Sequence, residues 1–236
     1  MSASVRRSDA WDPIWSGSSY ARADRRASRA RVKVAALAAL RFEAGEGERV
    51  LDLGCGSGHN MVEIAARTRA RARWIACDRS TVAARAARTT FDGAGLDGAV
   101  LAADAVHLPF RASSIDAVLA FMVLHHLPRS DDALAEIDRV LADGGRLGVV
   151  VPGRWSLASA TSAVRKAAGL WPYDQRTYTA RALRTELEMR FEIQAVRAFH
   201  LGFDRPVTAL ADRALGAVIP AWGRYLVALC RKRARR

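Results

Sequence analysis

Short apolar runs alternate with amphipathic stretches along most of this 236-residue chain. The apolar runs predict strands at residues 49–54, 73–78, 98–104, 114–124 and 144–152. Apolar residues at helical spacing predict helices at residues 59–70, 80–91 and 130–141, the last with Ser130 as its N-cap. Strands that alternate with helices are typical of a parallel sheet covered on both faces.

The pattern is less regular toward the two ends of the chain. Residues 29–42 and 181–190 have helical spacing, whereas residues 191–200 and 224–232 have the composition of strands. No long helix separates the last two of these predicted strands. A parallel pair needs a long crossover connection, so the pattern favours a last strand that joins the edge of the sheet in antiparallel orientation.

The first predicted strand continues directly into a glycine-rich turn, "VLDLGCGSGHN". Gly54, Gly56 and Gly58 permit tight turns and let the backbone approach a ligand closely. Ligands of open parallel sheets bind beyond the carboxyl ends of the strands. The spacing is not the dinucleotide pattern G-x-G-x-x-G, no Walker lysine follows, and Asp52 suits a cationic group better than a pyrophosphate. A turn without a ligand is the alternative that this stretch alone leaves open.

Two further predicted strands also end in a carboxylate. Asp78 ends the second strand and can accept hydrogen bonds from both hydroxyls of a ribose. Asp104 follows the third strand and can accept from an exocyclic adenine amine, with apolar Leu108 and Phe110 nearby. Together with Asp52, these carboxylates match an ammonium, a ribose and an adenine.

This combination resembles the class I S-adenosylmethionine-dependent methyltransferases. "VLDLGCGSG", "IACD" and "AADAVHLPF" match their first three motifs, and "IDAVLAFMVLHHL" and "RVLADGGRLGVVVP" match their later strands. The resemblance covers about residues 45–152 and is strongest to small-molecule enzymes of quinone and natural-product biosynthesis. It implies an α/β, Rossmann-like fold: a seven-stranded, mostly parallel sheet with an antiparallel last strand and helices on both faces.

The resemblance also implies a division of the chain and a set of site residues. A methyltransferase domain over residues 45–236 would follow an N-terminal helical and aromatic lid segment, 1–44, and would contain an acceptor-pocket insertion at about 153–180. The implied cofactor is S-adenosylmethionine, with S-adenosylhomocysteine as its product and no metal. The implied cofactor-binding residues are Asp52, Gly54, Cys55, Gly56, Gly58, Asp78, Arg79, Asp104, Ala105 and Ala120.

Two adjacent histidines, His125 and His126, follow the fourth predicted strand. A histidine there can act as a base toward a hydroxyl or an activated carbon, and His125 is the favoured candidate. A structural pair before Pro128 is the alternative. Some relatives support such a histidine with an acid after the fifth strand, but here "VPG" stands in that place.

Aromatic residues gather in the lid segment and in the insertion, and they predict an apolar or aromatic small-molecule acceptor. The candidate acceptor residues are Trp15, Tyr20, Trp155, Trp171 and Tyr173. Packing in the core is the alternative role for these side chains. The pattern leaves O-, N- and C-methylation open.

The formal net charge of +13, mostly from arginine, suggests an RNA methyltransferase as an alternative function. The fourth strand reads "AFMVLHHL" and lacks the Asn-Pro-Pro-Tyr type of motif of base-amine methyltransferases. A non-catalytic, cofactor-binding accessory protein is the second alternative. The basic tail at 231–236 is either solvated or in weak contact with an anionic surface.

The cysteine spacing and the apolar stretches bear on the cellular compartment in which the protein is expected. Cys55, Cys77 and Cys230 have neither disulfide-scaffold nor metal-ligand spacing. The N-terminal residues have no apolar signal-peptide core, and charged residues and a proline interrupt the apolar stretch at 206–230. We therefore expect a cytoplasmic protein, with a peripheral membrane contact through residues 209–222 as the alternative. We also expect a homodimer, because symmetric dimers are the commonest assemblies.

Overall fold

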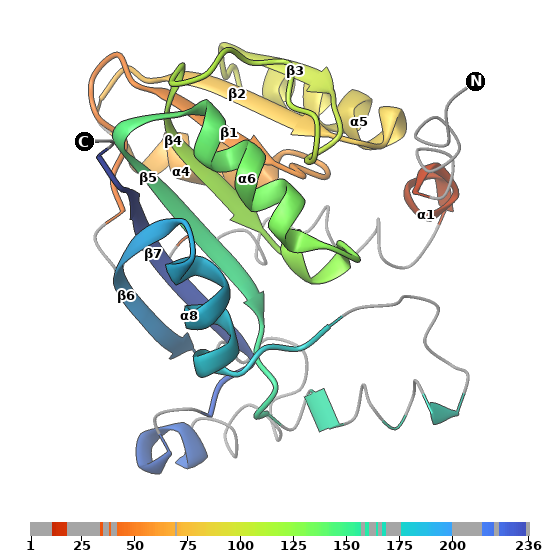
Figure 1. Ribbon diagram of the computed structural model, residues 1–236. Coiled ribbons are helices and arrows are strands. Elements are labelled where there is room, and N and C mark those ends of the chain that lie inside the picture. The colour runs from red at the N-terminus through yellow and green to blue at the C-terminus, as the bar shows by residue number, and fades with distance from the viewer. Residues whose placement is uncertain are drawn as a thin grey trace.

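A twisted seven-stranded sheet forms the centre of the protein in the computed structural model (Figure 1). The model describes residues 11–17, 34, 38, 42–68, 70–156, 159–160, 164, 167–168, 176–199, 214–219 and 222–234. The strands are β1 (Arg49–Leu53), β2 (Arg73–Asp78), β3 (Gly98–Ala102), β4 (Ile115–Phe121), β5 (Leu141–Pro152), β6 (Phe191–Phe199) and β7 (Tyr225–Lys232). Each lies on one of the apolar runs that predicted a strand.

The strand order is β3-β2-β1-β4-β5-β7-β6. Neighbours from β3 to β5 pair in parallel, and β7 pairs antiparallel with both β5 and β6. The predicted mostly parallel sheet with an antiparallel last strand is therefore confirmed. The chain reverses its direction of strand addition between β1 and β4, and such a switch point is where open sheets of this kind bind ligands.

The expected place of the last strand at the edge of the sheet was wrong. β7 lies between β5 and β6, and β6 forms the edge. The burial patterns give the reason: Leu226 to Cys230 are all buried, whereas exposed and half-buried residues alternate along most of β6. A strand that is apolar on both faces needs neighbours on both sides, while a strand with exposed polar residues tolerates an edge.

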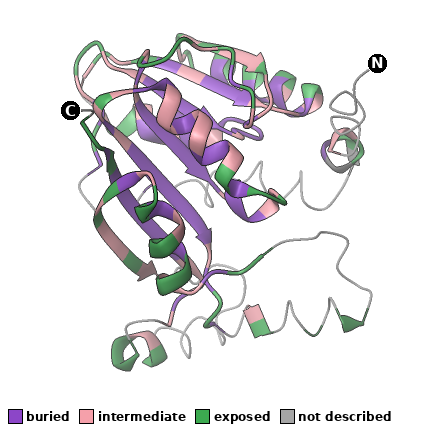
Figure 2. Ribbon diagram, viewed as in Figure 1, coloured by how far each residue is buried: buried purple, intermediate pink, exposed green. Residues whose placement is uncertain are grey.

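Helices cover both faces of the sheet, as predicted. α6 (Ser130–Val140) and α8 (Ala180–Glu188) lie in front of it in Figure 1, and α4 (His59–Arg67) lies behind with α5 (Thr81–Gly93). Figure 2 shows that the central strands are buried and that exposed residues lie on the outer faces of the helices.

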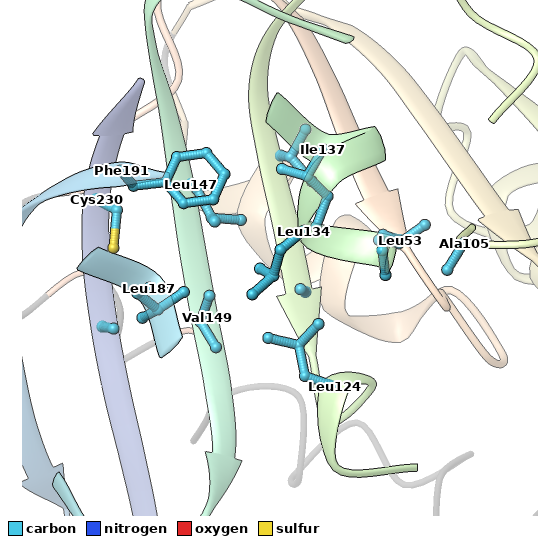
Figure 3. Close-up of a cluster of buried hydrophobic side chains, with 14 of the residues drawn as sticks. Leu53, Ala105, Leu124, Leu134, Ile137, Leu147, Val149, Leu187, Phe191 and Cys230 are labelled. Carbon is cyan, nitrogen blue, oxygen red and sulfur yellow. The ribbon is translucent and has the colours of Figure 1, made fainter. Parts of the chain in front are cut away.

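Each face has its own cluster of buried apolar side chains. Figure 3 shows the front cluster, in which Leu134 of α6 and Leu187 of α8 pack near Leu147 and Val149 of β5. The cluster behind the sheet includes Phe91 of α5. These two layers hold the carboxyl ends of β1 to β4 in fixed positions, and those ends carry the candidate site.

The start of α6 differs from the prediction. Ser130 is the first residue of the helix rather than its N-cap, and Arg129, the residue in the N-cap position, makes no side-chain capping hydrogen bond. The Ser130 hydroxyl instead donates to Glu186 of α8, so it is oriented away from the backbone of its own helix. Asp131 and Asp132 in the first turn interact favourably with the helix dipole.

The described part of the N-terminal segment includes α1 (Asp12–Gly17). The helix predicted at 29–42 lies almost entirely outside the described residues. No helix in the part of the chain that the structure describes is long and apolar enough to cross a membrane.

Candidate active site

A pocket of about 290 Å³ lies at the carboxyl ends of β1 to β4, at the switch point of the sheet. Successive strand ends, the N-terminal segment and the turn after β4 all contribute to it. The lining residues are Trp11, Trp15, Leu53, Gly54, Asp78, Arg79, Ala103, Asp104, Ala105, Met122, Val123, His126, Leu127 and Pro128. Five of the predicted cofactor residues are therefore brought together on one surface: Gly54, Asp78, Arg79, Asp104 and Ala105.

The glycine-rich turn after β1 has a backbone that side chains would disrupt. Gly54, Gly56 and Gly58 have φ angles of 65°, 55° and 79°, a region that glycine adopts without steric cost. A Cβ on Gly54 would lie 2.4 Å from Cγ2 of Val123, which also lines the pocket. A Cβ on Gly58 would lie 3.1 Å from Ala87 of α5. Gly54 therefore allows β1 and the residues after β4 to meet at the pocket, and Gly58 allows the helices to pack.

The Asp78 carboxylate at the end of β2 is oriented by two backbone donors. Oδ2 accepts from the Gly56 N–H and Oδ1 accepts from the Ser80 N–H, each at 2.9 Å. An ionised carboxylate has about four acceptor sites, so these bonds orient the group without exhausting its capacity. A fixed carboxylate on the pocket wall suits a ligand with neighbouring hydroxyls, such as a ribose.

A second carboxylate, Asp104, lies just beyond the end of β3. Its Oδ2 is 3.7 Å from Nε of Arg79, and its Oδ1 accepts from the Val106 N–H at 3.3 Å. Both charged side chains are about a quarter exposed, so the pair lies partly buried on the wall of the pocket. Ala105 is buried beside it and gives an apolar surface next to the carboxylate.

Five other predicted cofactor residues do not line this pocket: Asp52, Cys55, Gly56, Gly58 and Ala120. Ala120 is fully buried within β4 and pairs with Val149. Met122 and Val123 line the pocket where Ala120 was expected. Met122 has a φ of 57°, which is uncommon outside glycine, and the sequence carries no signal for this backbone turn.

The two histidines lie in a single 3-10 turn, η2 (Leu124–His126), and they face different surroundings. His126 lines the pocket, whereas His125 is only 2% exposed and is absent from the lining. Their ring centroids are 3.9 Å apart, and the ring of Trp11 meets His126 edge-on at 4.9 Å. Of the two histidines, His126 therefore borders the pocket and His125 does not, although both ring nitrogens of His126 are buried.

The helix α1 forms one wall of the pocket. Its Asp12 carboxylate accepts hydrogen bonds from the hydroxyls of Ser80 and Thr81, at the start of α5. Ser80 is also the N-cap of α5 and accepts from the Ala83 N–H at 3.2 Å. Trp15 is buried against Ala83. The predicted lid segment is therefore tied to the rim of the pocket at the described residues.

Of the remaining aromatic candidates, only Trp155 lies in the part of the chain that the structure describes. Trp155 is 51% exposed and is not among the lining residues. Tyr20, Trp171 and Tyr173 lie outside the described residues. Trp11 belongs to the aromatic segment that predicted an acceptor site, but only the structure shows that it lies on the pocket.

The described cysteines are buried and do not line the pocket. Among the described residues, no group of histidine, cysteine or acidic side chains has the arrangement of a metal site. Burial raises the pKa of the Cys77 thiol well above its usual value, and it raises that of Cys230 to about 12. Both cysteines are therefore protonated at neutral pH and are poor nucleophiles.

Comparisons with known proteins agree with this geometry. Residues 51–149 match the methyltransferase domain family. The chain is similar to a demethylmenaquinone methyltransferase from Thermobifida fusca (strain YX), with 42% identity over 106 residues, covering 44% of each protein. It is also similar to a malonyl-[acyl-carrier protein] O-methyltransferase from Geobacter sulfurreducens, with 34% identity over 152 residues, covering 64% of this chain and 56% of that protein.

A solved S-adenosylmethionine-dependent methyltransferase from Methanosarcina mazei has a similar fold. The TM-score is 0.66 at 20% sequence identity, over 84% of this chain and 98% of that one. At this identity the likeness concerns the fold. The chain spans about half the length of the two curated relatives, so their similarity does not concern the whole of each protein.

Proposed function

Because residues 51–149 carry a class I S-adenosylmethionine-dependent methyltransferase domain, we propose that the protein transfers a methyl group from S-adenosylmethionine to a small, apolar or aromatic organic acceptor. The observation that carries this proposal is the pocket at the switch point of the sheet. It combines the bare backbone of Gly54 with the carboxylates of Asp78 and Asp104 at successive strand ends.

The pocket residues fit the cofactor. A side chain at Gly54 would collide with Val123, so the turn has room only for backbone beside the ligand. The oriented carboxylate of Asp78 matches the ribose hydroxyls, and Asp104 with Ala105 matches the adenine amine and ring. We assign Asp52 and the rest of the glycine turn to the methionine end. When bound, S-adenosylmethionine supplies an electrophilic methyl group on a sulfonium.

The protein's own part in such a displacement is to align the acceptor and to exclude water. Apolar side chains on the pocket wall suit both roles: Trp11 and Trp15 come from the N-terminal segment, and Met122, Leu127 and Pro128 come from the chain after β4. His126 lies among them, with both ring nitrogens buried. We propose it as the base that takes a proton from an acceptor hydroxyl or activated carbon. A base is needed only where the acceptor atom must lose a proton.

The apolar lining and the relatives support the same class of acceptor. The relatives include proteins named for demethylmenaquinone and for a fatty acid, both of which are largely apolar. The aromatic wall at Trp11 and Trp15 suits an acceptor of that kind. We also propose the division into a lid segment at 1–44 and a domain at 45–236, because α1 already borders the pocket.

The test uses S-adenosylmethionine with a labelled methyl group, the purified protein and an extract of its source cells. We expect label in the organic-soluble fraction with the wild-type protein and little with Asp78→Ala. Label in an acid-insoluble fraction that nuclease releases would establish the RNA alternative instead. An absence of transfer to any fraction, with the cofactor bound, would leave two explanations: an extract without the acceptor, or the non-catalytic alternative.

A further inference from the structure

The turn that carries the two histidines is held from outside the pocket by Arg176. The backbone N–H of Arg176 donates to the His125 carbonyl at 3.0 Å. Its Nη2 donates to the Leu124 carbonyl at 3.1 Å. One residue, about fifty positions further along the chain, therefore binds two consecutive carbonyls of η2.

The guanidinium of Arg176 is itself fixed. Its Nη2 also donates to the hydroxyl oxygens of Ser130, at 2.8 Å, and Tyr178, at 3.0 Å. Ser130 in turn donates to Glu186 of α8. These contacts connect η2 to the start of α6 and to α8, so the guanidinium has little freedom to move.

Tyr178 connects this group to the sheet. It is 4% exposed, and the Arg176 guanidinium lies over its ring at 5.4 Å from the centroid. The Tyr178 N–H donates to the Pro152 carbonyl at 2.9 Å, and the Tyr178 carbonyl accepts from the Arg154 N–H at 2.7 Å. The position of Arg176 is therefore set by the end of β5.

The histidine turn needs such support because it is short. η2 has three residues and follows Met122, whose backbone is in the left-handed region. A single 3-10 turn has few hydrogen bonds of its own and poorer hydrogen-bond geometry than an α-helix. Small shifts of this turn would change the direction of the His126 ring in the pocket.

We propose that Arg176 is a positioning residue for the histidine turn. Its guanidinium holds η2 so that His126 faces the acceptor beside Trp11, although Arg176 is not among the residues that line the pocket. The catalytic consequence rests on the proposed methyl transfer, whereas the positioning itself does not. The arrangement also makes the geometry of the pocket depend on a residue near the end of the predicted insertion at about 153–180.

The test compares Arg176→Met, which removes the guanidinium donors, with Arg176→Lys and a matched control, Arg190→Met. Arg190 makes a bidentate ion pair with Asp131 between the end of α8 and the start of α6, without contact to η2. The readouts are the imidazole NMR signals of His125 and His126, S-adenosylhomocysteine affinity, and methyl transfer to the organic-soluble fraction.

We expect Arg176→Met to shift or broaden both imidazole signals and to lower the transfer rate by about tenfold to a hundredfold, because displaced catalytic groups cost this much. S-adenosylhomocysteine affinity should change by less than about threefold, which is under 1 kcal/mol. Arg176→Lys should restore part of the rate, since an ammonium can reach one carbonyl but lacks the planar fork. Arg190→Met should leave the imidazole signals in place.

Unmoved imidazole signals in a folded Arg176→Met protein would overturn the proposal. The proposal would also be overturned if Arg176→Met and Arg190→Met lost the same thermal stability and the same transfer rate. If the wild-type protein transfers no methyl group but the signals still shift in Arg176→Met, the positioning stands and the proposed function fails.

Discussion

At the scale of single residues, the pocket depends on the absence of a side chain as much as on the carboxylates. Gly54 has a φ of 65°, and its Cα faces Val123 at a distance that excludes a Cβ. Gly95 has a similar φ of 62°, but no atom lies within 4 Å of the place of its Cβ. A substitution at Gly95 therefore introduces backbone strain alone, whereas a substitution at Gly54 introduces both backbone strain and crowding against Val123.

We predict that Gly54→Ala lowers S-adenosylhomocysteine affinity by about tenfold or more, equal to at least about 1.4 kcal/mol, because Val123 must move on the pocket wall. Gly95→Ala should cost about 1 kcal/mol of unfolding free energy from strain and leave affinity unchanged. Calorimetry and chemical denaturation measure the two quantities. Equal affinity losses in both variants would contradict the assignment of Gly54 to the site.

Some residues of the site could be predicted from the sequence and others could not. Gly54, Asp78 and Asp104 stand at strand ends that apolar runs make visible. Met122 and Val123 could not be found, because a left-handed turn at a non-glycine residue leaves no pattern. Which of the adjacent residues His125 and His126 faces the pocket depends on the path of one 3-10 turn, and composition does not specify that path.

At the scale of elements, α1 is held on the pocket through one carboxylate. Asp12 accepts from Ser80 and Thr81, while Trp11 and Trp15 of the same segment line the pocket. Because these tryptophans line the pocket that we assign to the cofactor, we expect α1 to move before the cofactor leaves. The strength of the Asp12 contact should then affect the rate of release.

We predict that Asp12→Ala raises the dissociation rate of S-adenosylhomocysteine by about tenfold, as expected for the loss of a hydrogen bond to a charged group worth about 1.5 kcal/mol. Stopped-flow fluorescence measures this rate. Ser16→Ala is the control, since the exposed Ser16 hydroxyl donates to a carbonyl within α1 and not to α5. A dissociation rate equal to that of the wild-type protein would show that α1 does not control release.

A charged pair ties the starts of β1 and β4 at the opposite end of the strands. Asp116 accepts from the Arg49 N–H at 2.8 Å and from its guanidinium Nε at 3.0 Å. These hydrogen bonds hold the pKa of the Asp116 carboxyl below its usual range. Since the folded-state pKa is lowered, the pair stabilises the fold above the unfolded-state value and is lost as pH falls through the folded-state value.

We predict that Asp116→Asn lowers the unfolding free energy at neutral pH by at most about 1 kcal/mol, because the pair is partly exposed. The difference from wild type should shrink below about pH 4, where an unfolded-state aspartate becomes protonated. Denaturation curves across this range measure it. Asp92→Asn, which removes an exposed ion pair with Arg88, is the control. A difference in unfolding free energy between Asp116→Asn and the wild type that grows toward acid pH would contradict the prediction.

The order of the elements was only partly predictable. Buried parallel strands leave near-continuous apolar runs, so β1 to β5 were visible in the sequence. The antiparallel strands β6 and β7 were visible from their strand-like composition. The position of β7 between β5 and β6 was not, because strand neighbours are chosen by tertiary packing rather than by a local pattern. The prediction of Ser130 as an N-cap was wrong for the same reason, because its hydroxyl donates to Glu186, which lies on another helix.

At the scale of the whole molecule, the net charge of +13 is a weak guide to partners. Several arginines of the described chain serve the fold through carboxylate pairs: Arg49 with Asp116, Arg139 with Glu136, Arg146 with Glu48 and Arg190 with Asp131. We predict that a short RNA binds only weakly at about 0.15 M salt and does not displace S-adenosylhomocysteine. Fluorescence anisotropy measures this, and tight, salt-resistant binding would favour the RNA alternative.

Cytoplasmic location and a homodimer remain predictions. The predicted basic tail at 231–236 was wrong at its start, because Arg231 and Lys232 belong to β7 and Lys232 is buried. A weak anionic contact remains a prediction for the residues after Lys232. None of them changes the argument for the pocket, because every contact that defines it lies within one chain. The pocket is also the feature on which the cofactor assignment, the histidine turn and the lid all depend.

The most direct test of the cofactor assignment is therefore a calorimetric titration of the purified protein with S-adenosylhomocysteine, beside Asp78→Ala and the control Asp92→Ala. We predict saturable binding to the wild-type protein and to Asp92→Ala, and an affinity at least about tenfold lower for Asp78→Ala, which loses charge-assisted hydrogen bonds to the ribose. Absence of binding to the folded wild-type protein, or equal affinity in all three, would contradict the assignment of this pocket to the cofactor.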